Sequence, residues 1–249
     1  MEFIWSNNTL ADFIMREQTV HLWKSPLNSS PQTLDYLFSL LSPDEITRAE
    51  RFYQSKHRHE FILARGLLRI ILGRYLGTNP NSIIFSYSSR GKPVLADFAQ
   101  PLQFNLSHSA GLVIYAISSF KQVGIDLEHQ KKIDSVEDLA KRFFSPQEYQ
   151  YLIKQSDKSP IFFKLWTAKE AYLKATGEGI AGGLDKIIIN IKEDGNLCIG
   201  EPWSLFSFSP ETEYYGALVV SNSQEEIEIS AFSLSDDVDR FYLEQDRNH

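Results

Sequence analysis

Ser42-Pro43-Asp44-Glu45 and Ser145-Pro146-Gln147-Glu148 are two copies of one helix-start pattern, and together they decide the fold that the sequence predicts. The serine can cap a helix, the proline suits the first helical position, and the glutamate can accept a hydrogen bond from the cap's backbone N–H. Each copy precedes a long helical pattern of apolar residues, at about 56–76 in the first half and about 161–176 in the second. The spacing therefore suggests an internal repeat.

Short β-like runs surround both helical patterns and predict two similar α+β halves. Chance recurrence is the alternative reading, because alternation of helices and hairpins is common. No low-complexity linker separates the halves, so we expect them to pack as one unit with a cleft between them. The expected lobes are residues 1–120 and 121–249. The β-like runs lie at 19–23, 83–87, 104–106, 112–118, 123–127, 186–191, 214–220 and 227–232.

Composition excludes several classes of protein. The 249 residues are 43% hydrophobic and carry a net charge of −7, which argues against a protein that coats nucleic acid. Cys198 is the single cysteine, so neither an intramolecular disulfide nor a thiolate metal cluster can form. The first 18 residues lack the pattern of a signal peptide, and no apolar run approaches the roughly 20 residues of a membrane helix. We expect a cytoplasmic protein with no membrane or nucleic-acid partner.

Val123-Gly124-Ile125-Asp126-Leu127-Glu128 is an apolar strand that ends in two carboxylates. The two-residue period of a strand places Asp126 and Glu128 on one face. Paired carboxylates on a rigid edge suit a hard cation such as Mg²⁺, which binds one or two of them together with substrate phosphates. Two solvated acids at a strand end are the alternative, and the hexapeptide by itself favours that alternative.

Leu165-Trp166-Thr167-Ala168-Lys169-Glu170-Ala171-Tyr172-Leu173-Lys174 places an acid and a base on one face of the second long helix. Glu170 and Lys174 stand four residues apart, and both could serve a reaction site. The alternative is an ordinary helix-stabilising pair worth about 0.2–0.5 kcal/mol, and the segment taken alone favours it.

Three further segments supply groups that can bind an anion. Arg90-Gly91-Lys92-Pro93 combines cations with a glycine that lets the backbone approach a ligand, although such a tetrapeptide is most often a simple turn. Phe104-Asn105-Leu106-Ser107-His108-Ser109 offers amide, hydroxyl and imidazole groups at a strand end. The first long helix and the segment before it carry cations, of which Arg65, beside a glycine, is the best candidate to face a ligand.

The order of these blocks, continued by Phe143-Phe144-Ser145-Pro146 and the Trp166 helix, resembles the Sfp-type 4′-phosphopantetheinyl transferases. The matching blocks run from Ser42 to about Gly179. The resemblance implies the fold of that family, with two lobes related by a pseudo-twofold axis and the active site in the cleft between them. It also implies a monomer, in agreement with the repeat.

By this resemblance the chain moves the phosphopantetheine arm of coenzyme A onto a serine of an apo carrier protein, with Mg²⁺ as cofactor. The second lobe would bind the metal through Asp126, Glu128 and Glu170, and Glu170 and Lys174 would be catalytic. The first lobe would bind the nucleotide and phosphates of coenzyme A. The expected coenzyme A ligands are Arg48, Arg65, Arg90, Gly91, Lys92, Pro93, Asn105, Ser107, His108, Asp126 and Lys174. The first helical block departs from the family pattern, since Glu45 stands where some relatives have lysine.

The implied acceptors are acyl or peptidyl carrier proteins of fatty acid, polyketide or nonribosomal peptide synthesis. A magnesium-dependent nucleotide or pyrophosphate hydrolase could use the same three acids, but it would release 3′,5′-ADP without a carrier protein. A binding module for carrier proteins or coenzyme A is a further rival. The intact acidic set argues against a module, which has no need of a metal site.

Overall fold

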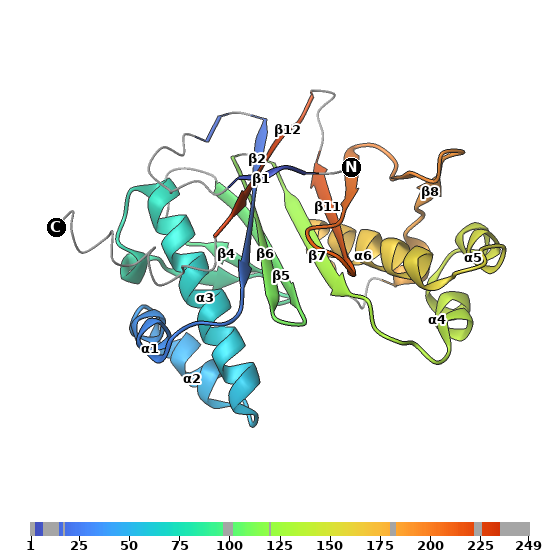
Figure 1. Cartoon of the computed structure of the whole chain (residues 1–249). Coiled ribbons are helices and arrows are strands. Elements are labelled where there is room, and N and C mark those ends of the chain that lie inside the picture. The colour runs from blue at the N-terminus through green and yellow to red at the C-terminus, as the bar shows by residue number, and fades with distance from the viewer. Residues whose placement is uncertain are drawn as a thin grey trace.

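The computed structural model describes residues 3–6, 15–16, 18–96, 102–119, 121–179, 183–221 and 226–234. Its elements form two lobes, the first on the left and the second on the right of Figure 1. Each lobe has its own sheet with helices packed against it, so the predicted α+β class and the two-lobed architecture are confirmed. Across those ranges none of the helices has both the length and the apolar character needed to cross a membrane.

The sheet of the first lobe has the strand order β1-β12-β2-β6-β5 in the described residues. Strand β12 runs parallel to both of its neighbours, whereas β2, β6 and β5 pair antiparallel. The long helix α3 shares a buried core with this sheet and ends at Gly77, whose φ of 59° is in the left-handed region that glycine favours. The elements are β1 (Trp5–Ser6), β2 (Thr19–Pro26), α1 (Pro31–Ser39), α2 (Pro43–Glu50), α3 (Ser55–Leu76), η2 (Pro80–Ser82), β3 (Phe85–Tyr87), β4 (Pro93–Leu95), β5 (Leu102–Ser109), β6 (Leu112–Ser119) and β12 (Glu228–Ser233).

The second lobe repeats this plan on a smaller scale. Its described sheet has the antiparallel order β10-β11-β7, and the long helix α6 packs on β7 and β11. Helix α6 ends at Gly177, which also has a positive φ. The elements are β7 (Val123–His129), α4 (Val136–Phe143), α5 (Pro146–Ile153), α6 (Ser159–Thr176), η4 (Leu184–Lys186), β8 (Asn190–Ile191), β9 (Leu197–Cys198), β10 (Trp203–Phe208) and β11 (Tyr214–Ser221).

The two lobes have the same connectivity. In the first, β2 leads through three helices, a 3₁₀ turn and the β3–β4 ribbon to the β5–β6 hairpin. In the second, β7 leads through three helices, a 3₁₀ turn and the β8–β9 ribbon to the β10–β11 hairpin. The matching sheet orders are β2-β6-β5 and β7-β11-β10. The repeat suggested by the two Ser-Pro-x-Glu segments therefore extends to every element between the first strand and the last hairpin.

Strand β12 follows residue 120 in the chain but belongs to the sheet of the first lobe, where it pairs with β2. A division of the chain at residue 120 therefore does not separate the two lobes completely. A core cluster also joins the two sheets. It combines Leu22 and Ile114 of the first sheet with Ile125 and Leu218 of the second. The lobes therefore pack together as one unit.

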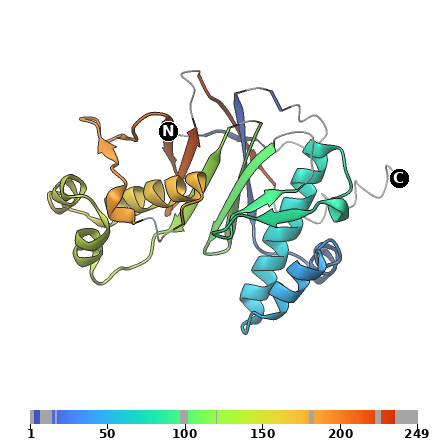
Figure 2. The same cartoon turned by 180° about the vertical axis from the view of Figure 1, so that it is seen from behind.

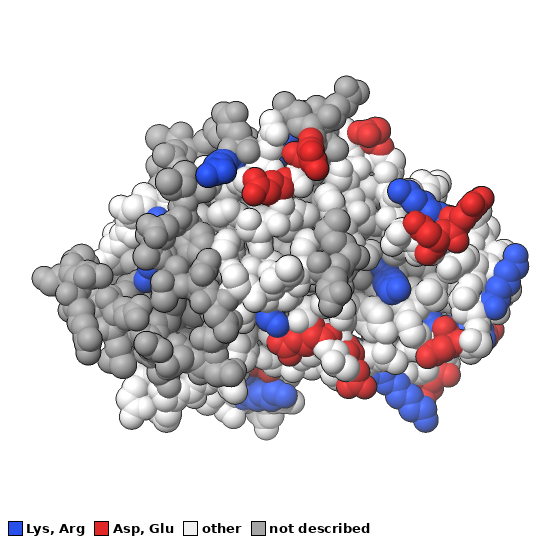
Figure 3. Space-filling view, turned by 45° about the horizontal axis from the view of Figure 1, so that its top comes forward, with Lys and Arg blue, Asp and Glu red and all other residues white. Residues whose placement is uncertain are grey.

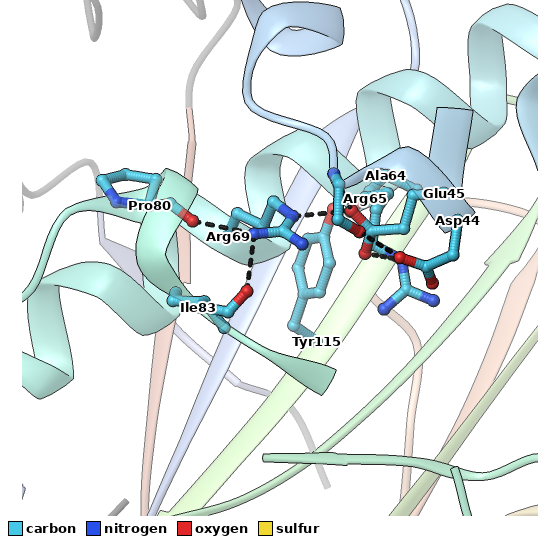
Figure 4. Close-up of polar contacts among 9 residues, drawn as sticks. Asp44, Glu45, Ala64, Arg65, Arg69, Pro80, Ile83 and Tyr115 are labelled. Atoms are coloured by element: carbon cyan, nitrogen blue, oxygen red, sulfur yellow. Dashed lines mark hydrogen bonds and ion pairs between the residues drawn. The ribbon is translucent and has the colours of Figure 1, made fainter. Parts of the chain in front are cut away.

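Glu45 anchors α2 to the middle of the first lobe. Its carboxylate accepts from the backbone N–H of Ser42 at 3.0 Å and from Nε of Arg69 on α3 at 2.7 Å. The same guanidinium donates to the carbonyls of Pro80, the first residue of η2, and Ile83, which follows η2, each at 2.9 Å (Figure 4). Arg69 and Glu45 are almost fully buried. One ion pair thus connects a helix cap, a long helix and a turn.

Glu148 and Lys169 repeat this network in the second lobe. The carboxylate of Glu148 accepts from the backbone N–H of Ser145 at 2.7 Å and lies 2.8 Å from Nζ of Lys169 on α6. Lys169 donates to the carbonyls of Leu184, the first residue of η4, and Ile187, which follows η4, at 2.9 and 2.6 Å. The counterpart of Lys169 in the first lobe is therefore Arg69.

Gly124 allows α6 to lie directly against β7, the contact seen from behind in Figure 2. A Cβ at this position would be 2.8 Å from the Cα of Ala175 and closer still to the carbonyl oxygen of Ala171. Both obstacles are backbone atoms of α6, which cannot move aside as a flexible side chain can. The spacing between helix and strand therefore depends on the absence of a side chain here.

Gly124→Ala should lower the free energy of unfolding by about 1–3 kcal/mol, because overpacking forces the backbone of α6 away from β7. Urea denaturation measures this change. Gly200→Ala is the matched control, since a Cβ at Gly200 meets nothing within 4 Å. Equal stability of the two variants would contradict the close approach described here.

Candidate active site

Three acidic side chains and a lysine meet where β7, α6 and β5 come together. Asp126 and Glu128 lie on β7, and Glu170 and Lys174 lie on α6. Nζ of Lys174 is 2.7 Å from Oδ1 of Asp126, and Ser107 of β5 donates to the same oxygen at 2.9 Å. Lys174 is also 2.9 Å from Oγ of Ser107. Residues of both lobes therefore contribute to one polar cluster.

Burial and mutual repulsion raise the pKa of two of these acids. Burial is the main cause of a rise in the pKa of Glu170 to about 7, with the charge of Asp126 adding to it and Lys174 opposing it. Burial also raises the pKa of Glu128, again with Asp126 as the next cause. The charge of Asp126 acts on both of these carboxyl groups, and that of Glu128 adds to the effect on Glu170, because the side chains lie near one another in a poorly solvated place. Clustered negative charge of this kind favours a nearby cation, and the ammonium of Lys174 supplies one.

The donor set fits a hard divalent cation. Oδ2 of Asp126 and Oε1 of Glu170 are buried and have no hydrogen-bond partner. Buried carboxylate oxygens without a partner are costly, and oxygen ligands of this kind are those that Mg²⁺ prefers. As the side chains stand, no described group of three or more His, Cys, Asp or Glu residues is close enough to hold a metal ion. The ammonium of Lys174 against Asp126 supplies the positive charge instead.

The predicted anion-binding loop Arg90-Gly91-Lys92-Pro93 extends from the first lobe to the C-terminal end of α6. Nζ of Lys92 donates to the carbonyls of Ala175 at 3.0 Å and Val123 at 3.3 Å, and burial lowers the pKa of Lys92 to about 8. Arg90 donates to the carbonyl of Glu178. Gly91 forms the turn with a φ of 82°. Lys92 therefore lies beside both elements that carry the acids.

The two other predicted ligands from β5 lie on opposite faces of that strand. Asn105 is buried, and its Oδ1 accepts from the backbone N–H of Ile125 on β7 at 2.9 Å. His108 is exposed and directly follows Ser107, which contacts the acids. The side-chain Oδ1 of Asn105 is therefore already hydrogen-bonded within the protein, whereas the ring of His108 is accessible to a ligand.

The structure does not bring Arg48 and Arg65 to the carboxylates through any contact among the described residues. Arg48 is exposed, with its guanidinium 5.3 Å from the ring centre of Phe61. Arg65 is buried, and its Nε lies 3.4 Å from Oε1 of Glu45. Glu45, the residue that departs from the family pattern, thus holds a cation. The assignment of both arginines to phosphate binding stays a prediction.

Ser109 contacts the site but was not among the residues predicted from the sequence. Its Oγ donates to Oε2 of Glu128 at 3.2 Å and accepts from the backbone N–H of His129 at 3.1 Å. The signal was present in the alternation of β5, since Ser109 follows Ser107 by two residues and shares its face. Only the position of β7 reveals that this face meets the acids.

Comparison with known proteins gives matches over most of the chain. A family model described as "4'-phosphopantetheinyl transferase superfamily" matches residues 122–220, and one described as "4'-phosphopantetheinyl transferase, N-terminal" matches residues 25–120. The 4'-phosphopantetheinyl transferase HetI of Nostoc sp. is 47% identical over 208 residues, which cover 81% of this chain and 87% of HetI. The 4'-phosphopantetheinyl transferase Sfp of Bacillus subtilis is 33% identical over 175 residues, covering 70% of this chain and 76% of Sfp.

Solved structures give a weaker match. The holo-[acyl-carrier-protein] synthase AcpS of Neisseria meningitidis is 24% identical, with a TM-score of 0.35. The match covers 41% of this chain and 98% of AcpS.

The raised pKa of Glu170 predicts a specific pH dependence of stability when EDTA removes divalent cations. The folded state holds the Glu170 proton more tightly than the unfolded state, so the stability from this proton is complete below pH 4.5 and is lost as the pH rises through about 7. Between these values the unchanged protein should lose on the order of 2–3 kcal/mol more than Glu170→Gln. Urea denaturation across this pH range measures the difference.

Glu178→Gln, at an exposed position just beyond α6, serves as the control and should follow the unchanged protein. If Glu170→Gln gave the same pH profile as the control, the carboxyl of Glu170 would not have the raised pKa.

Proposed function

The chain belongs to the 4'-phosphopantetheinyl transferase superfamily, and we propose that it transfers the phosphopantetheine arm of coenzyme A to a serine of an apo carrier protein. The observation that carries the proposal is the meeting of acids from β7 and α6 at the junction with β5. A pyrophosphate bound there would have beside it carboxylate oxygens that can hold a metal ion and the ammonium of Lys174. Family membership alone does not provide this arrangement.

Asp126, Glu128 and Glu170 are proposed to hold one Mg²⁺. The two buried oxygens without a hydrogen-bond partner support this assignment, as do burial and the charge of Asp126, which together raise the pKa of Glu128 and of Glu170. When bound, the metal ion supplies neutralising charge to the pyrophosphate of coenzyme A. The side chains hold the reacting groups in position, and positioning with electrostatic stabilisation provides most of the acceleration of phosphoryl transfer.

Glu170 is proposed as the general base. The carrier serine attacks the phosphorus that bears the pantetheine arm, its hydroxyl proton passes to Glu170 directly or through a water, and the bond to 3′,5′-ADP breaks. Burial raises the pKa of Glu170 to about 7 in the metal-free protein, and a bound cation would lower it, so Glu170 would meet the serine as the carboxylate that a base requires. Its burial keeps bulk water away from the carboxylate.

Lys174 is proposed to bind the pyrophosphate and to stabilise the departing 3′,5′-ADP. Its ammonium lies beside Asp126 and Ser107, one turn along α6 from Glu170. A cation at this distance from the base can neutralise charge on the leaving group without blocking the attack of the serine.

The first lobe is proposed to bind the nucleotide end of coenzyme A. Ser107 of β5 donates to Asp126, the exposed His108 follows it on the same strand, and Nζ of Lys92 donates to a carbonyl at the end of α6. These positions extend from the proposed metal site toward the β3–β4 ribbon. The full proposed set is Arg48, Arg65, Arg90, Gly91, Lys92, Pro93, Asn105, Ser107, His108, Asp126 and Lys174.

Acyl or peptidyl carrier proteins are the proposed acceptors. On the described part of the face in Figure 3, acidic and basic side chains lie next to one another, so the net charge of −7 does not form a uniform negative surface there. An acidic carrier protein can therefore dock through a local contact. We further propose that the protein acts as a monomer in the cytoplasm, where its single cysteine, Cys198, stays reduced.

Incubation with an apo carrier protein, coenzyme A and Mg²⁺ should add one phosphopantetheine group to the carrier. Intact-protein mass spectrometry measures the gain, and EDTA should prevent it. Release of 3′,5′-ADP with several unrelated apo carriers left unmodified would replace the transferase with a hydrolase. Coenzyme A binding without either reaction would leave a binding module.

Glu170→Gln should lower the transfer rate by at least about 100-fold, because an amide cannot accept the serine proton. Coenzyme A binding, measured by calorimetry, should remain detectable. Glu178→Gln is the control and should transfer at the unchanged rate. An active Glu170→Gln variant would remove Glu170 from the mechanism.

A further inference from the structure

The edge strands of the two sheets meet without backbone pairing. In the described residues β5 pairs only with β6, and β7 pairs only with β11. Side chains of β5 connect the two edge strands instead. Residues at alternate positions of a strand share one face, and on β5 this face is directed toward β7. Asn105 accepts from the backbone N–H of Ile125, and Ser107 donates to Asp126. The junction between the lobes is thus a row of polar contacts with the proposed metal site in it.

Ser109 is the third member of this row. Its hydroxyl accepts from the backbone N–H of His129 at 3.1 Å and donates to Oε2 of Glu128 at 3.2 Å. The backbone of β7 therefore orients the hydroxyl, and the hydroxyl orients the carboxylate. Ser109 is half-buried, as is Glu128.

Glu128 is less buried than Asp126 and Glu170, so packing restrains its carboxylate less. Glu170 is buried on a helix, and Asp126 is buried and held by Ser107 and Lys174. Glu128 lies near the end of β7 on a longer side chain, and the charge of Asp126 repels its carboxylate. Among the described hydrogen bonds and ion pairs, the contact with Ser109 is the one that holds this carboxylate.

We propose that Ser109 is a positioning residue for the metal site. It holds the carboxylate of Glu128 where that carboxylate can bind a divalent cation together with Asp126 and Glu170. The proposal rests on the function proposed above. Residues that hydrogen-bond to a metal-binding side chain, without contacting the metal themselves, commonly change metal affinity or activity by about 10- to 100-fold when they are removed. Because Ser109 extends from the first lobe, metal affinity then depends on the alignment of the two lobes.

The test compares Ser109→Ala, which removes the hydroxyl, with Ser109→Thr, which keeps it. Ser109→Cys retains the approximate volume but donates a weak hydrogen bond. Ser39→Ala in α1 is the control, because the hydroxyl of Ser39 is exposed and donates to a carbonyl within its own helix. Two measurements apply to each protein. One is the Mg²⁺ concentration that gives half-maximal transfer, and the other is the rise in Tm on adding Mg²⁺ and coenzyme A without a carrier.

Ser109→Ala should need about 10-fold more Mg²⁺ for half-maximal transfer, and its Tm should respond at correspondingly higher Mg²⁺. Its rate at saturating Mg²⁺ should change far less than its Mg²⁺ requirement. Ser109→Thr and Ser39→Ala should follow the unchanged protein. Should Ser109→Ala fail to fold, Ser109→Cys decides by the same two measurements.

An unchanged Mg²⁺ requirement in a folded Ser109→Ala or Ser109→Cys variant would overturn the assignment of Ser109. A lower rate at saturating metal with the same Mg²⁺ requirement would overturn it too, because a purely structural contact gives that result. If the unchanged protein itself showed neither Mg²⁺-dependent transfer nor a Mg²⁺-dependent Tm, the proposed function would fail as well. That outcome is distinguishable, because it appears before any substitution is made.

Discussion

Gly124 sets the distance between α6 and β7, and that distance determines how closely the acids of the two elements approach one another. No side chain separates the helix from the strand at this point, so backbone atoms of Ala171 and Ala175 come close to the strand. Glu170 and Lys174 belong to this segment of α6, and Asp126 lies two residues beyond Gly124 on β7. The proposed chemistry needs these groups within reach of one phosphoryl group, and a wider spacing between helix and strand would separate them.

The paired networks of Glu45 with Arg69 and of Glu148 with Lys169 explain how each long helix keeps its place. Each joins the cap of a short helix, the long helix and the following turn through one buried carboxylate. Removing one partner from such a pair leaves an uncompensated charge and typically costs about 3–5 kcal/mol. The Ser-Pro-x-Glu segments therefore have a second purpose, since the capping glutamate also anchors the cation of the long helix.

Much of the secondary structure could be predicted from the sequence, because the residues that start, continue and end a helix are neighbours in the chain. Helix caps, apolar periodicity and Gly77 and Gly177 as helix ends depend on neighbouring residues. The contact of Lys92 with the end of α6 and the return of β12 to the first sheet depend on long-range packing, which one sequence does not reveal. The same is true of the choice between Arg65 and Arg69, since both stand on α3 within reach of Glu45 and only Arg69 also contacts the η2 turn.

Crystallographic anomalous scattering from Mn²⁺, bound in place of Mg²⁺ together with coenzyme A, tests the central claim most directly. One strong anomalous peak per chain is expected at the junction of β5, β7 and α6, within coordination distance of Asp126, Glu128 and Glu170. The ammonium of Lys174 is expected to move from Asp126 toward the pyrophosphate. A peak held by coenzyme A alone, or by residues elsewhere in the chain, would contradict the claim that these acids form the metal site.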